Sequence, residues 1–387
     1  MASARAFVTE LLKKADVVIG GNRPQDITVH DERFFNRVIR YGTLGLGEAY
    51  MDGWWDANRL DVFIHKVLTA HLDKAIEINF ASVFTVARAF FFNLQSGKRA
   101  FKVGEHHYDL GNDLYSAMLD KRMVYTCGYW SGNPPAGGLD EAQEAKLDLV
   151  CRKIGLKKGL PGQGDHILDI GCGWGSFAKY AAEKYGVSIV GITVSKEQAV
   201  LARELCEGLP IEIRVQDYRE VNEQFDHIIS LGMFEHVGVK NYRDYFKVAD
   251  RCLKKDGLFL LHTIGYQVSQ LTSDPWMEKY IFPGGQLPSI AQIGKAIEKL
   301  FIIEDIQNFG ADYDKTLMAW FTNFDAAWLA PSGVEGPRLK EKYGERFYRM
   351  WKYYLLSCAG VARAREMQLW QIVLSKGGVP GGYQSVR

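Results

Sequence analysis

The segment from Asp165 to Ala178, with the sequence DHILDIGCGWGSFA, constrains the fold of this chain more than any other feature. Its first part is apolar enough for a buried strand that ends near Asp169 and Ile170, and the alternate glycines that follow predict a tight loop before a helix. Glycine permits positive φ and close approach of a ligand, and a helix N-terminus offers free N–H donors. The segment therefore predicts a strand, a ligand-binding loop and a helix, although a glycine-rich turn without a ligand would have the same sequence.

Further strands follow at the spacing of right-handed βαβ units. Residues 188–194 form a continuous β-branched run typical of a buried parallel strand, after a helix expected over 175–185. Residues 211–217 alternate and end in an acid, and residues 225–232 are apolar and end in glycine. Because ligands of open α/β sheets bind at the carboxyl ends of the strands, we expect the site at that edge.

The α/β rhythm continues to the end of the chain. A helix expected over 241–255 leads to a strong strand over 258–264, which carries His262 near its end. Residues 265–288 then form an insertion that is long enough for a lid, with a packed surface loop as the alternative. A helix over 289–300, a strand over 301–307, helices near 315–329 and 338–358 and a last strand over 367–375 complete a predicted sheet of about seven strands.

The residues before about 104 have a different pattern and predict a small helical domain. Helical periodicity covers 10–17 and 32–40, and the glycine-rich and aromatic segment 41–55 is expected to be a loop. We therefore expect a helical lipid-association or membrane-association domain over 1–104 and a catalytic domain over 105–387.

One segment of the N-terminal domain is a candidate for contact with a membrane. Residues 76–101 are apolar and aromatic, and the cations Lys98, Arg99 and Lys102 gather at their end. Such a segment can lie in a lipid interface with its cations near phosphate headgroups. A helix buried between domains has the same composition, so both interpretations stay open.

Composition and charge fit an enzyme of the cytoplasm rather than a nucleic-acid-binding protein. The 47 basic and 46 acidic residues leave a net charge of +1, which gives no global field to attract nucleic acid. The six cysteines form no CxxC pair, so we expect reduced thiols. The first residues are polar and interrupted, so we expect no signal peptide, and no uncharged run reaches the roughly 18 to 20 residues that a membrane span needs.

The spacing of the glycines separates two kinds of cofactor. A nicotinamide dinucleotide fingerprint has the spacing GxGxxG, whereas Gly171, Gly173 and Gly175 alternate. The second strand carries Thr193 where that fingerprint has an acid, and Asp217 ends a later strand. This DxGxGxG pattern resembles the class I methyltransferases that bind S-adenosylmethionine, with a nicotinamide enzyme as the alternative.

A series of motifs extends the resemblance along most of the chain. In order they are HHYDLGNDLYSAML, YTCGYW, LDIGCGWG, VGITVSKEQ, QDYRE, SLGMFEHVG, DRCLKKDG, FLLHTIG, DPWMEKYIFPGG, FGADYDKTLMAW and YYLLSCAGVARAREMQLWQ. Together they resemble the cyclopropane fatty acid synthases from about residue 30 to 375. The motif LGLGEAYMDGWW lies in an N-terminal domain that resembles the bacterial phospholipid type.

The resemblance implies a class I methyltransferase fold, Rossmann-like and α/β, and a specific reaction. The methyl carbon of S-adenosylmethionine is transferred to a cis double bond of an unsaturated phospholipid acyl chain, and a cyclopropane ring closes after proton loss, with release of S-adenosylhomocysteine. An alkene is a weak nucleophile, so the methyl group must be held in line with it. The carbocation that forms must be kept from water and lose a proton, so the site needs a dry wall and a base. In this family the base is a bound bicarbonate.

The functional residues of the family carry over onto matching positions of this sequence. The bicarbonate site falls on Cys127, Glu235, His262, the backbone of Ile264 and Tyr313, and Cys358 matches cysteines proposed as catalytic. The cofactor site falls on Tyr125, Thr126, Leu168, Asp169, Gly171, Cys172, Gly173, Trp174, Gly175, Ser176, Thr193, Val194, Gln198, Asp217 and Tyr218. Glu235 in a structural hydrogen bond, Tyr313 in the core and Cys358 buried within a helix are the alternatives for these three residues.

The resemblance also implies the partners. We expect peripheral contact with the bilayer at the inner face of the cytoplasmic membrane, a homodimer, no metal and no nucleic acid. A lipid-binding module with a vestigial cofactor site is one alternative. A methyltransferase for small molecules is another, and it would leave the N-terminal domain unexplained.

Overall fold

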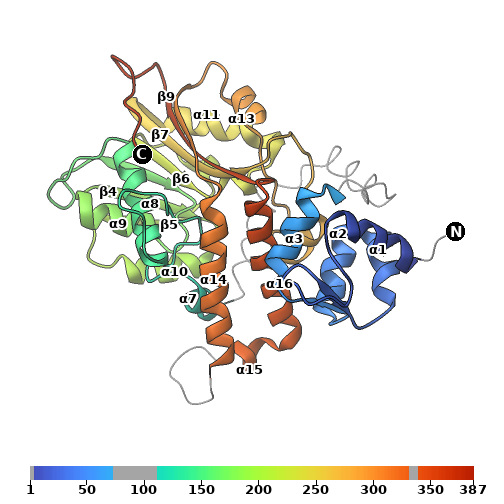
Figure 1. The fold of residues 1–387 in the computed structure, drawn as a ribbon. Coiled ribbons are helices and arrows are strands. Elements are labelled where there is room, and N and C mark those ends of the chain that lie inside the picture. The colour runs from blue at the N-terminus through green and yellow to red at the C-terminus, as the bar shows by residue number, and fades with distance from the viewer. Residues whose placement is uncertain (1–3, 73–110, 331–338) are drawn as a thin grey trace. The chain divides into compact units, whose positions relative to one another are not determined.

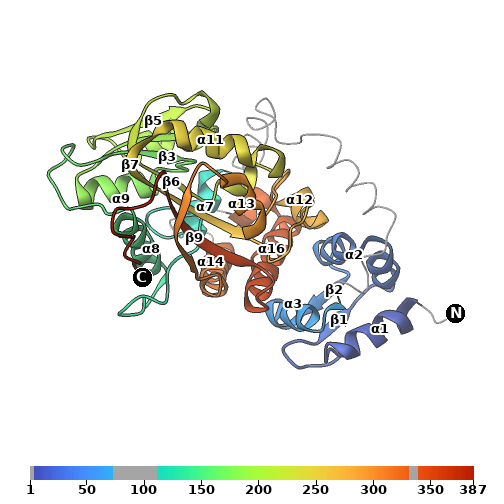
Figure 2. The same cartoon turned by 90° about the horizontal axis from the view of Figure 1, so that it is seen from above.

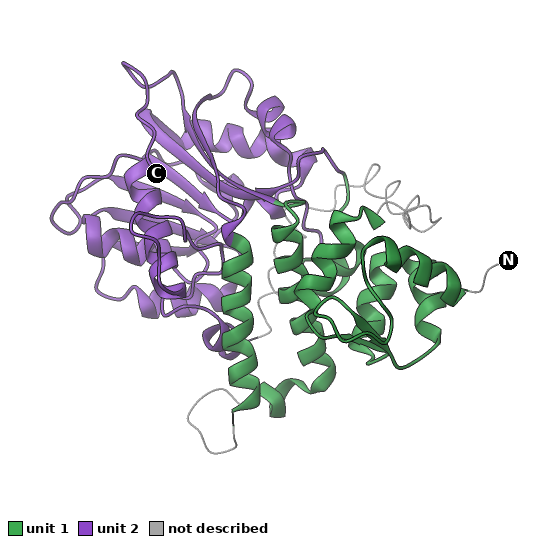
Figure 3. Ribbon diagram, in the orientation of Figure 1, with its two compact units in different colours: residues 1–92, 271–283, 313–367 green, residues 93–270, 284–312, 368–387 purple. Residues whose placement is uncertain are grey.

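The computed structural model describes residues 4–72, 111–330 and 339–387 (Figure 1). The chain packs into two compact units (Figure 3). Unit 1 comprises residues 1–92, 271–283 and 313–367, and unit 2 comprises residues 93–270, 284–312 and 368–387. Two segments from the C-terminal half thus share a unit with the N-terminal helices, whereas the sequence divides the chain near residue 104. That boundary, and the segment 76–101 with its cations, lie outside the described residues.

Unit 2 is built on a sheet of seven strands in the order β5-β4-β3-β6-β7-β9-β8 (Figure 1). Strand β9 is antiparallel to β7 and to β8, and the other neighbours pair in parallel. The strands are β3 (His166–Ile170), β4 (Ser188–Thr193), β5 (Ile211–Val215), β6 (Phe225–Leu231), β7 (Leu253–Gly265), β8 (Ile302–Asn308) and β9 (Gln368–Ser375). The predicted, mostly parallel sheet is confirmed, and β3 to β7 all end at one edge.

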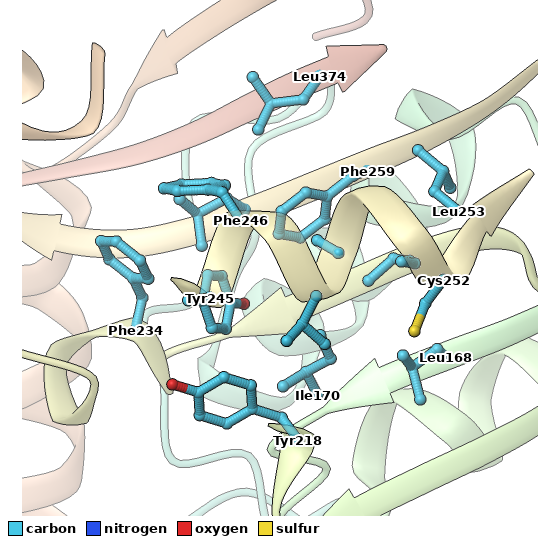
Figure 4. Close-up of a cluster of buried hydrophobic side chains, with 14 of the residues drawn as sticks. Leu168, Ile170, Tyr218, Phe234, Tyr245, Phe246, Cys252, Leu253, Phe259 and Leu374 are labelled. Carbon is cyan, nitrogen blue, oxygen red and sulfur yellow. The ribbon is translucent and has the colours of Figure 1, made fainter. Parts of the chain in front are cut away.

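Helices cover both faces of this sheet (Figure 2). On one face α8 and α9 bury Leu147, Val150 and Phe177 against the strands. On the other face α11 and α13 pack on the sheet, and Figure 4 shows Tyr245 and Phe246 of α11 among the core residues. The helices of this unit include α7 (Asn112–Met118), α8 (Leu139–Lys153), α9 (Ser176–Tyr185), α10 (Lys196–Leu205), α11 (Tyr242–Cys252), α13 (Ile290–Ile297) and the 3₁₀ turns η1 (Tyr218–Glu220), η2 (Phe234–His236) and η3 (Val239–Asn241).

Strand β7 begins earlier than the sequence predicts. The helix expected over 241–255 ends at Cys252, and Leu253 already pairs with Phe225 of β6. Both side chains are fully buried, so their burial in the sheet outweighs the helical periodicity. At Gly257 a Cβ atom would lie 2.2 Å from the carbonyl oxygen of Asp226, so this close approach of the two strands requires glycine.

Unit 1 is largely helical. Its short strands β1 (Ile27–Val29) and β2 (Trp55–Ala57) pair antiparallel. Its helices include α1 (Ala4–Lys14), α2 (Arg33–Met51), α3 (Leu60–Thr69), α12 (Pro275–Tyr280), α14 (Asp312–Leu329, which begins one residue before unit 1), α15 (Leu339–Tyr343) and α16 (Glu345–Arg363). None of the helices among the described residues is long and apolar enough to cross a membrane.

The prediction of a loop over 41–55 is wrong for most of that segment, because α2 continues to Met51 with a kink at Gly42. The glycines serve close packing instead of chain reversal. A Cβ atom at Gly47 would lie 2.4 Å from the Trp276 ring of α12, so only glycine lets the two helices approach this closely. The buried Tyr50 and the apolar residues around it stabilise the helix through tertiary contacts.

Candidate active site

The loop after β3 has the conformation that its glycines predict. Gly171, Gly173 and Gly175 have φ values of 85°, 55° and 78°, which other residues rarely adopt. At Gly171 a Cβ atom would also lie 2.6 Å from the side chain of Met233. Gly175 is the N-cap of α9, so the free N–H groups of that helix lie directly after the loop. The loop therefore offers backbone donors at the carboxyl edge of the sheet.

Side chains around this loop are fixed by neighbours from α7. The indole N–H of Trp174 donates to Asn112 Oδ1 at 3.0 Å, and Tyr115 packs against both Trp174 and Tyr125 with ring centroids 4.9 and 5.1 Å apart. The sequence did not single out Asn112 or Tyr115 as site residues, although both lie in the motif HHYDLGNDLYSAML. The aromatic cluster ties the predicted cofactor residues Trp174 and Tyr125 together.

The other predicted loop residues have varied environments. Leu168 is fully buried in the core, Cys172 is buried, and Ser176 donates to the carbonyl of Met123 at 3.1 Å. Val194, after β4, is half-buried.

The ends of β4 and β5 carry polar groups that are held by local hydrogen bonds. Thr193 Oγ1 donates to Gln198 Oε1 at 3.1 Å. The Asp217 carboxylate accepts from the backbone N–H of Arg219 at 2.9 Å and from its guanidinium at 2.7 Å. The adjacent Tyr218 hydroxyl is buried and has no partner among the described residues, and burial raises its pKa to about 12. Tyr218 thus offers a neutral donor or acceptor to a ligand.

Asp169 at the end of β3 is a buried acid. Only 2% of its surface is exposed, and burial raises the pKa of its carboxyl to about 7, although Lys146 acts in the opposite direction. A cationic ligand group beside it would lower that pKa and stabilise the carboxylate. Asp169 is therefore suited to bind an ammonium group.

The segment 125–127 is held from α8 by two buried polar side chains. Gln143 Nε2 donates to the Thr126 carbonyl at 2.7 Å, and Lys146 Nζ donates to Thr126 Oγ1 at 2.8 Å. Cys127, which follows, is fully buried. Sequence reasoning missed Gln143 and Lys146. Their spacing on the apolar face that also carries Leu147 and Val150 is the signal that could have found them.

Glu235 lies in the turn η2 directly after β6. Its Oε1 accepts the N–H of Ile264 at 2.7 Å, whereas its Oε2 is buried with no partner among the described residues. Burial raises the pKa of this carboxyl to about 7, and the hydrogen bond from Ile264 limits the rise. Glu235 can therefore exchange a proton near neutral pH.

His262 on β7 is also buried and carries an atom without a partner. Its Nδ1 lies 3.4 Å from Nε2 of Gln371, the residue directly opposite on β9. With the amide N–H of Gln371 as the donor, Nδ1 is the acceptor and the imidazole proton is on Nε2, which has no partner among the described residues. Burial lowers the pKa of His262 well below its ordinary value, so the ring is neutral. His262 therefore presents an N–H donor.

Two predicted catalytic residues belong to unit 1. Tyr313 on α14 is buried and packs its ring against Trp320 with centroids 6.3 Å apart. Cys358 on α16 is half-buried, and desolvation raises the pKa of its thiol. A thiol that stays protonated is a poor nucleophile, so a covalent role for Cys358 has no support in its environment. The roles of both residues stay predictions.

A family model for mycolic acid cyclopropane synthetase matches residues 95–372. The chain belongs to this family. It therefore contains the class I methyltransferase fold, and it is an S-adenosylmethionine-dependent methyltransferase, as the sequence predicts.

The relatives cover different shares of the chain. The "Cyclopropane-fatty-acyl-phospholipid synthase" of Escherichia coli (strain K12) is 54% identical over 371 residues, which are 96% of this chain and 93% of that protein. The solved structure of the cyclopropane synthase MmaA2 from Mycobacterium tuberculosis superposes with a TM-score of 0.63 at 30% identity and covers 71% of this chain and 98% of that one. The mycolic acid cyclopropane synthase CmaA1, complexed with SAH and CTAB, gives a TM-score of 0.63 at 31% identity, with 71% and 98% covered.

Proposed function

We propose that this chain is a cyclopropane-fatty-acyl-phospholipid synthase. It transfers the methyl group of S-adenosylmethionine to a cis double bond of a phospholipid acyl chain: the sulfur–methyl bond breaks and a carbon–carbon bond forms. Loss of one proton from the new methyl group and formation of a second carbon–carbon bond give the ring. S-adenosylhomocysteine and a proton are the other products.

The observation that carries this proposal is the extent of the identity. The Escherichia coli phospholipid enzyme matches 96% of this chain, whereas the mycolic acid synthases match 71% of it although almost all of their own length is covered. The likeness to the phospholipid enzyme thus includes N-terminal residues that the family model, which begins at residue 95, does not reach.

The residues present fit S-adenosylmethionine. The glycine loop and the N-terminus of α9 offer backbone donors, and the buried Asp169 suits the ammonium group. The hydroxyl of Tyr218, which has no partner in the part of the chain that the structure describes, suits a polar edge of the base. When bound, the cofactor supplies an electrophilic methyl group on a sulfonium centre. The chain holds it in place, and a bound methyl in line with the alkene removes much of the entropic barrier.

The residues near Glu235 fit bicarbonate. Two buried polar atoms, Glu235 Oε2 and His262 Nε2, have no partner among the described residues, and unpartnered buried polar atoms are costly unless a ligand or water satisfies them. A bicarbonate ion can accept from the N–H of His262 and donate its own O–H to a carboxylate. When bound, it supplies a base. We propose that Cys127, which lies in the same unit, contributes to this site, and the role that the resemblance gives to Tyr313 of unit 1 stays a prediction.

The residues of the chain then have distinct tasks. The N–H of Ile264 holds Glu235 Oε1, which leaves Oε2 to take up a proton, and a pKa of about 7 allows Glu235 to release that proton again. Gln371 keeps the His262 proton on Nε2. The ring of Phe309, with its centroid 5.8 Å from that of His262, helps to keep water out.

Isotopic labelling tests the proposed reaction. The protein is incubated with vesicles of unsaturated phospholipid and S-adenosylmethionine that carries a CD₃ group, and the lipids are analysed by mass spectrometry. Ring closure removes one deuteron from the transferred methyl, so each modified chain should gain about 16 Da. A gain of about 17 Da would mean that the intact methyl group is retained and would contradict ring closure, and unchanged lipid mass would contradict the activity.

We also propose that residues 1–104 mediate peripheral contact with the inner face of the cytoplasmic membrane and that the protein is a homodimer. Changing Lys98, Arg99 and Lys102 to glutamate should weaken binding to anionic vesicles by about 1 kcal/mol or more per site and reduce its salt dependence. Binding of S-adenosylhomocysteine should not change. Wild-type vesicle binding by the triple variant at low salt would exclude this segment as the membrane contact.

Analytical ultracentrifugation of the wild-type protein tests the proposed homodimer, because the sedimentation coefficient distinguishes a dimer from a monomer.

A further inference from the structure

Lys146 has an unusual position for a lysine. It lies on the face of α8 that packs against the sheet, and its side chain is fully buried. Buried lysines are rare because desolvation disfavours the charged form, and burial lowers the pKa of Lys146 to about 8. An apolar side chain would therefore be more stable at this position, unless the charge of Lys146 interacts with another group.

The hydrogen bond from Lys146 fixes the direction in which Thr126 can act. An ammonium group has donors only, so at 2.8 Å the Thr126 hydroxyl accepts from Lys146. The single proton of that hydroxyl must then be donated to another group. Thr126 is consequently a polarised donor, which suits an anion.

Two further contacts hold Thr126 in place. Gln143, one turn before Lys146 on α8, binds the Thr126 carbonyl. Gly232, directly after β6, has a φ of 74°, and a Cβ atom there would lie 2.6 Å from Thr126 Cγ2. Thr126 thus lies directly over the end of β6, at the carboxyl edge where the cofactor is expected.

The charges around Lys146 match a zwitterion. Asp120 and Asp169 interact electrostatically with Lys146, and the Asp120 oxygens also accept backbone N–H groups of Arg122 and Val124. Asp169, at the end of β3, is suited to the ammonium group of an amino acid. Lys146 with Thr126 offers a positive charge and a donor beside the end of β6, the strand that pairs with β3. The amino-acid part of S-adenosylmethionine carries both of these charges.

We propose that Lys146 is a positioning residue for the carboxylate of the cofactor, acting through Thr126. Lys146 orients the hydroxyl so that it donates to the carboxylate and supplies the buried positive charge that the anion requires. The inference rests on the assignment of S-adenosylmethionine as cofactor. It does not depend on the lipid substrate.

A comparison of the affinities for two ligands, one with the carboxylate and one without it, distinguishes this role from a merely structural one. S-adenosylhomocysteine has the carboxylate and 5′-methylthioadenosine lacks the amino-acid part, and both can be titrated into the lipid-free protein by calorimetry. Lys146→Met should weaken S-adenosylhomocysteine roughly 10- to 100-fold, the range for a lost charged hydrogen bond, and change 5′-methylthioadenosine less than about twofold. Thr126→Val should reproduce this pattern, Thr126→Ser should largely retain affinity, and the double variant Lys146→Met/Thr126→Val should lose little more than either single variant.

Lys153 provides the matched control. It is the other fully buried lysine of α8, and its Nζ lies 4.0 Å from Asp305 rather than on Thr126. Lys153→Met should leave the ratio of the two affinities at its wild-type value. Equal weakening of both ligands by Lys146→Met, or an unchanged ratio in Thr126→Val, would overturn the proposal. Thr126→Val keeps the test valid if Lys146→Met does not fold, and failure of the wild type to bind S-adenosylhomocysteine would instead refute the cofactor assignment.

Discussion

A network of buried charges in unit 1 and a set of buried titratable groups in unit 2 have opposite environments. In unit 1 the fully buried Asp61 binds Arg363 at 2.9 Å and Arg59 at 2.8 Å, and Arg363 also binds Asp314 at 2.8 Å. Burial acts against the charged form of Asp61, but these hydrogen bonds outweigh it and lower the pKa. The carboxylate is thus stabilised in its charged form.

In unit 2 burial shifts the pKa values of Asp169, Glu235 and Lys146 in the direction that favours their neutral forms. Burial raises the pKa of Asp169 and of Glu235 to about 7, and it lowers the pKa of Lys146 to about 8. Glu235 and His262 also carry buried atoms without partners among the described residues. Groups held this far from their preferred state are typical of sites that bind or transfer charge. The paired charges of Asp61 and Arg363 stabilise the fold, whereas Asp169, Glu235 and Lys146 have the environments expected of groups that meet a ligand.

The largest effect should follow from the removal of one titratable group in unit 2. Glu235→Gln keeps the size of the side chain and its bond to Ile264 but cannot take up a proton. Turnover should fall by roughly 10² or more, in the range of lost acid–base catalysis, while the affinity for S-adenosylhomocysteine stays nearly constant. Steady-state kinetics and calorimetry measure the two quantities. A variant with wild-type turnover would remove Glu235 from the chemistry.

A substitution in the ion network of unit 1 should affect stability instead. Arg363→Met leaves the buried Asp61 with Arg59 alone, and the free energy of unfolding should fall by about 2 to 3 kcal/mol. Urea denaturation measures this loss. The double variant Asp61→Leu/Arg363→Met should recover part of it, because no buried charge is then left without its partner. A loss below about 0.5 kcal/mol in the single variant would show that the network contributes little.

The raised pKa of Glu235 in unit 2 should make the stability of the protein depend on pH. The pKa of Glu235 is about 7 when folded, against 4.5 ordinarily, so its stabilising contribution is complete below about 4.5 and is lost as the pH rises through 7. Glu235→Gln removes this dependence. In bicarbonate-free buffer the variant should match the wild type near pH 5 and exceed its unfolding free energy by up to about 3 kcal/mol at pH 8. A constant difference between pH 5 and pH 8 would argue against the raised pKa.

The smallest effect should come from an ion pair in solvent. Lys247 and Asp244 on α11 are 3.2 Å apart, but their side chains are 58% and 66% exposed. Lys247→Ala should change the unfolding free energy by about 0.5 kcal/mol or less, since water and salt screen such a pair. The same denaturation series measures it. A loss as large as that of Arg363→Met would mean that burial does not distinguish the two ion pairs.

Prediction from sequence succeeded where one local rule decides the structure. The β3 loop needs positive φ at alternate positions, and Gly171, Gly173 and Gly175 give this signal directly. In α2 the same residue type misled the prediction, because Gly47 is required by the Trp276 ring, which lies far away in sequence. Glycine alone does not say whether a turn or a close contact requires it.

The environment of His262 depends on how strands that are distant in the sequence pair with one another. His262 is opposite Gln371 on β9, and Gln371 is opposite Gln307 on β8, so the state of the imidazole is fixed by strands that are distant in sequence. Lys146 was missed because a lysine in a charged helix sequence normally faces solvent. The packing of α8 on the sheet shows that it is buried, and its spacing with Leu147 and Val150 is the one hint of this in the sequence.

The central claim is that Glu235 Oε2 and His262 Nε2, which have no partner within residues 4–72, 111–330 and 339–387, hold a bicarbonate ion that the reaction needs. Its most direct test is the initial rate of product formation in rigorously carbonate-free medium, followed by titration with bicarbonate at constant pH and ionic strength. We predict that the wild-type rate falls in carbonate-free medium and is restored along a saturable curve. Full activity without bicarbonate would contradict the claim.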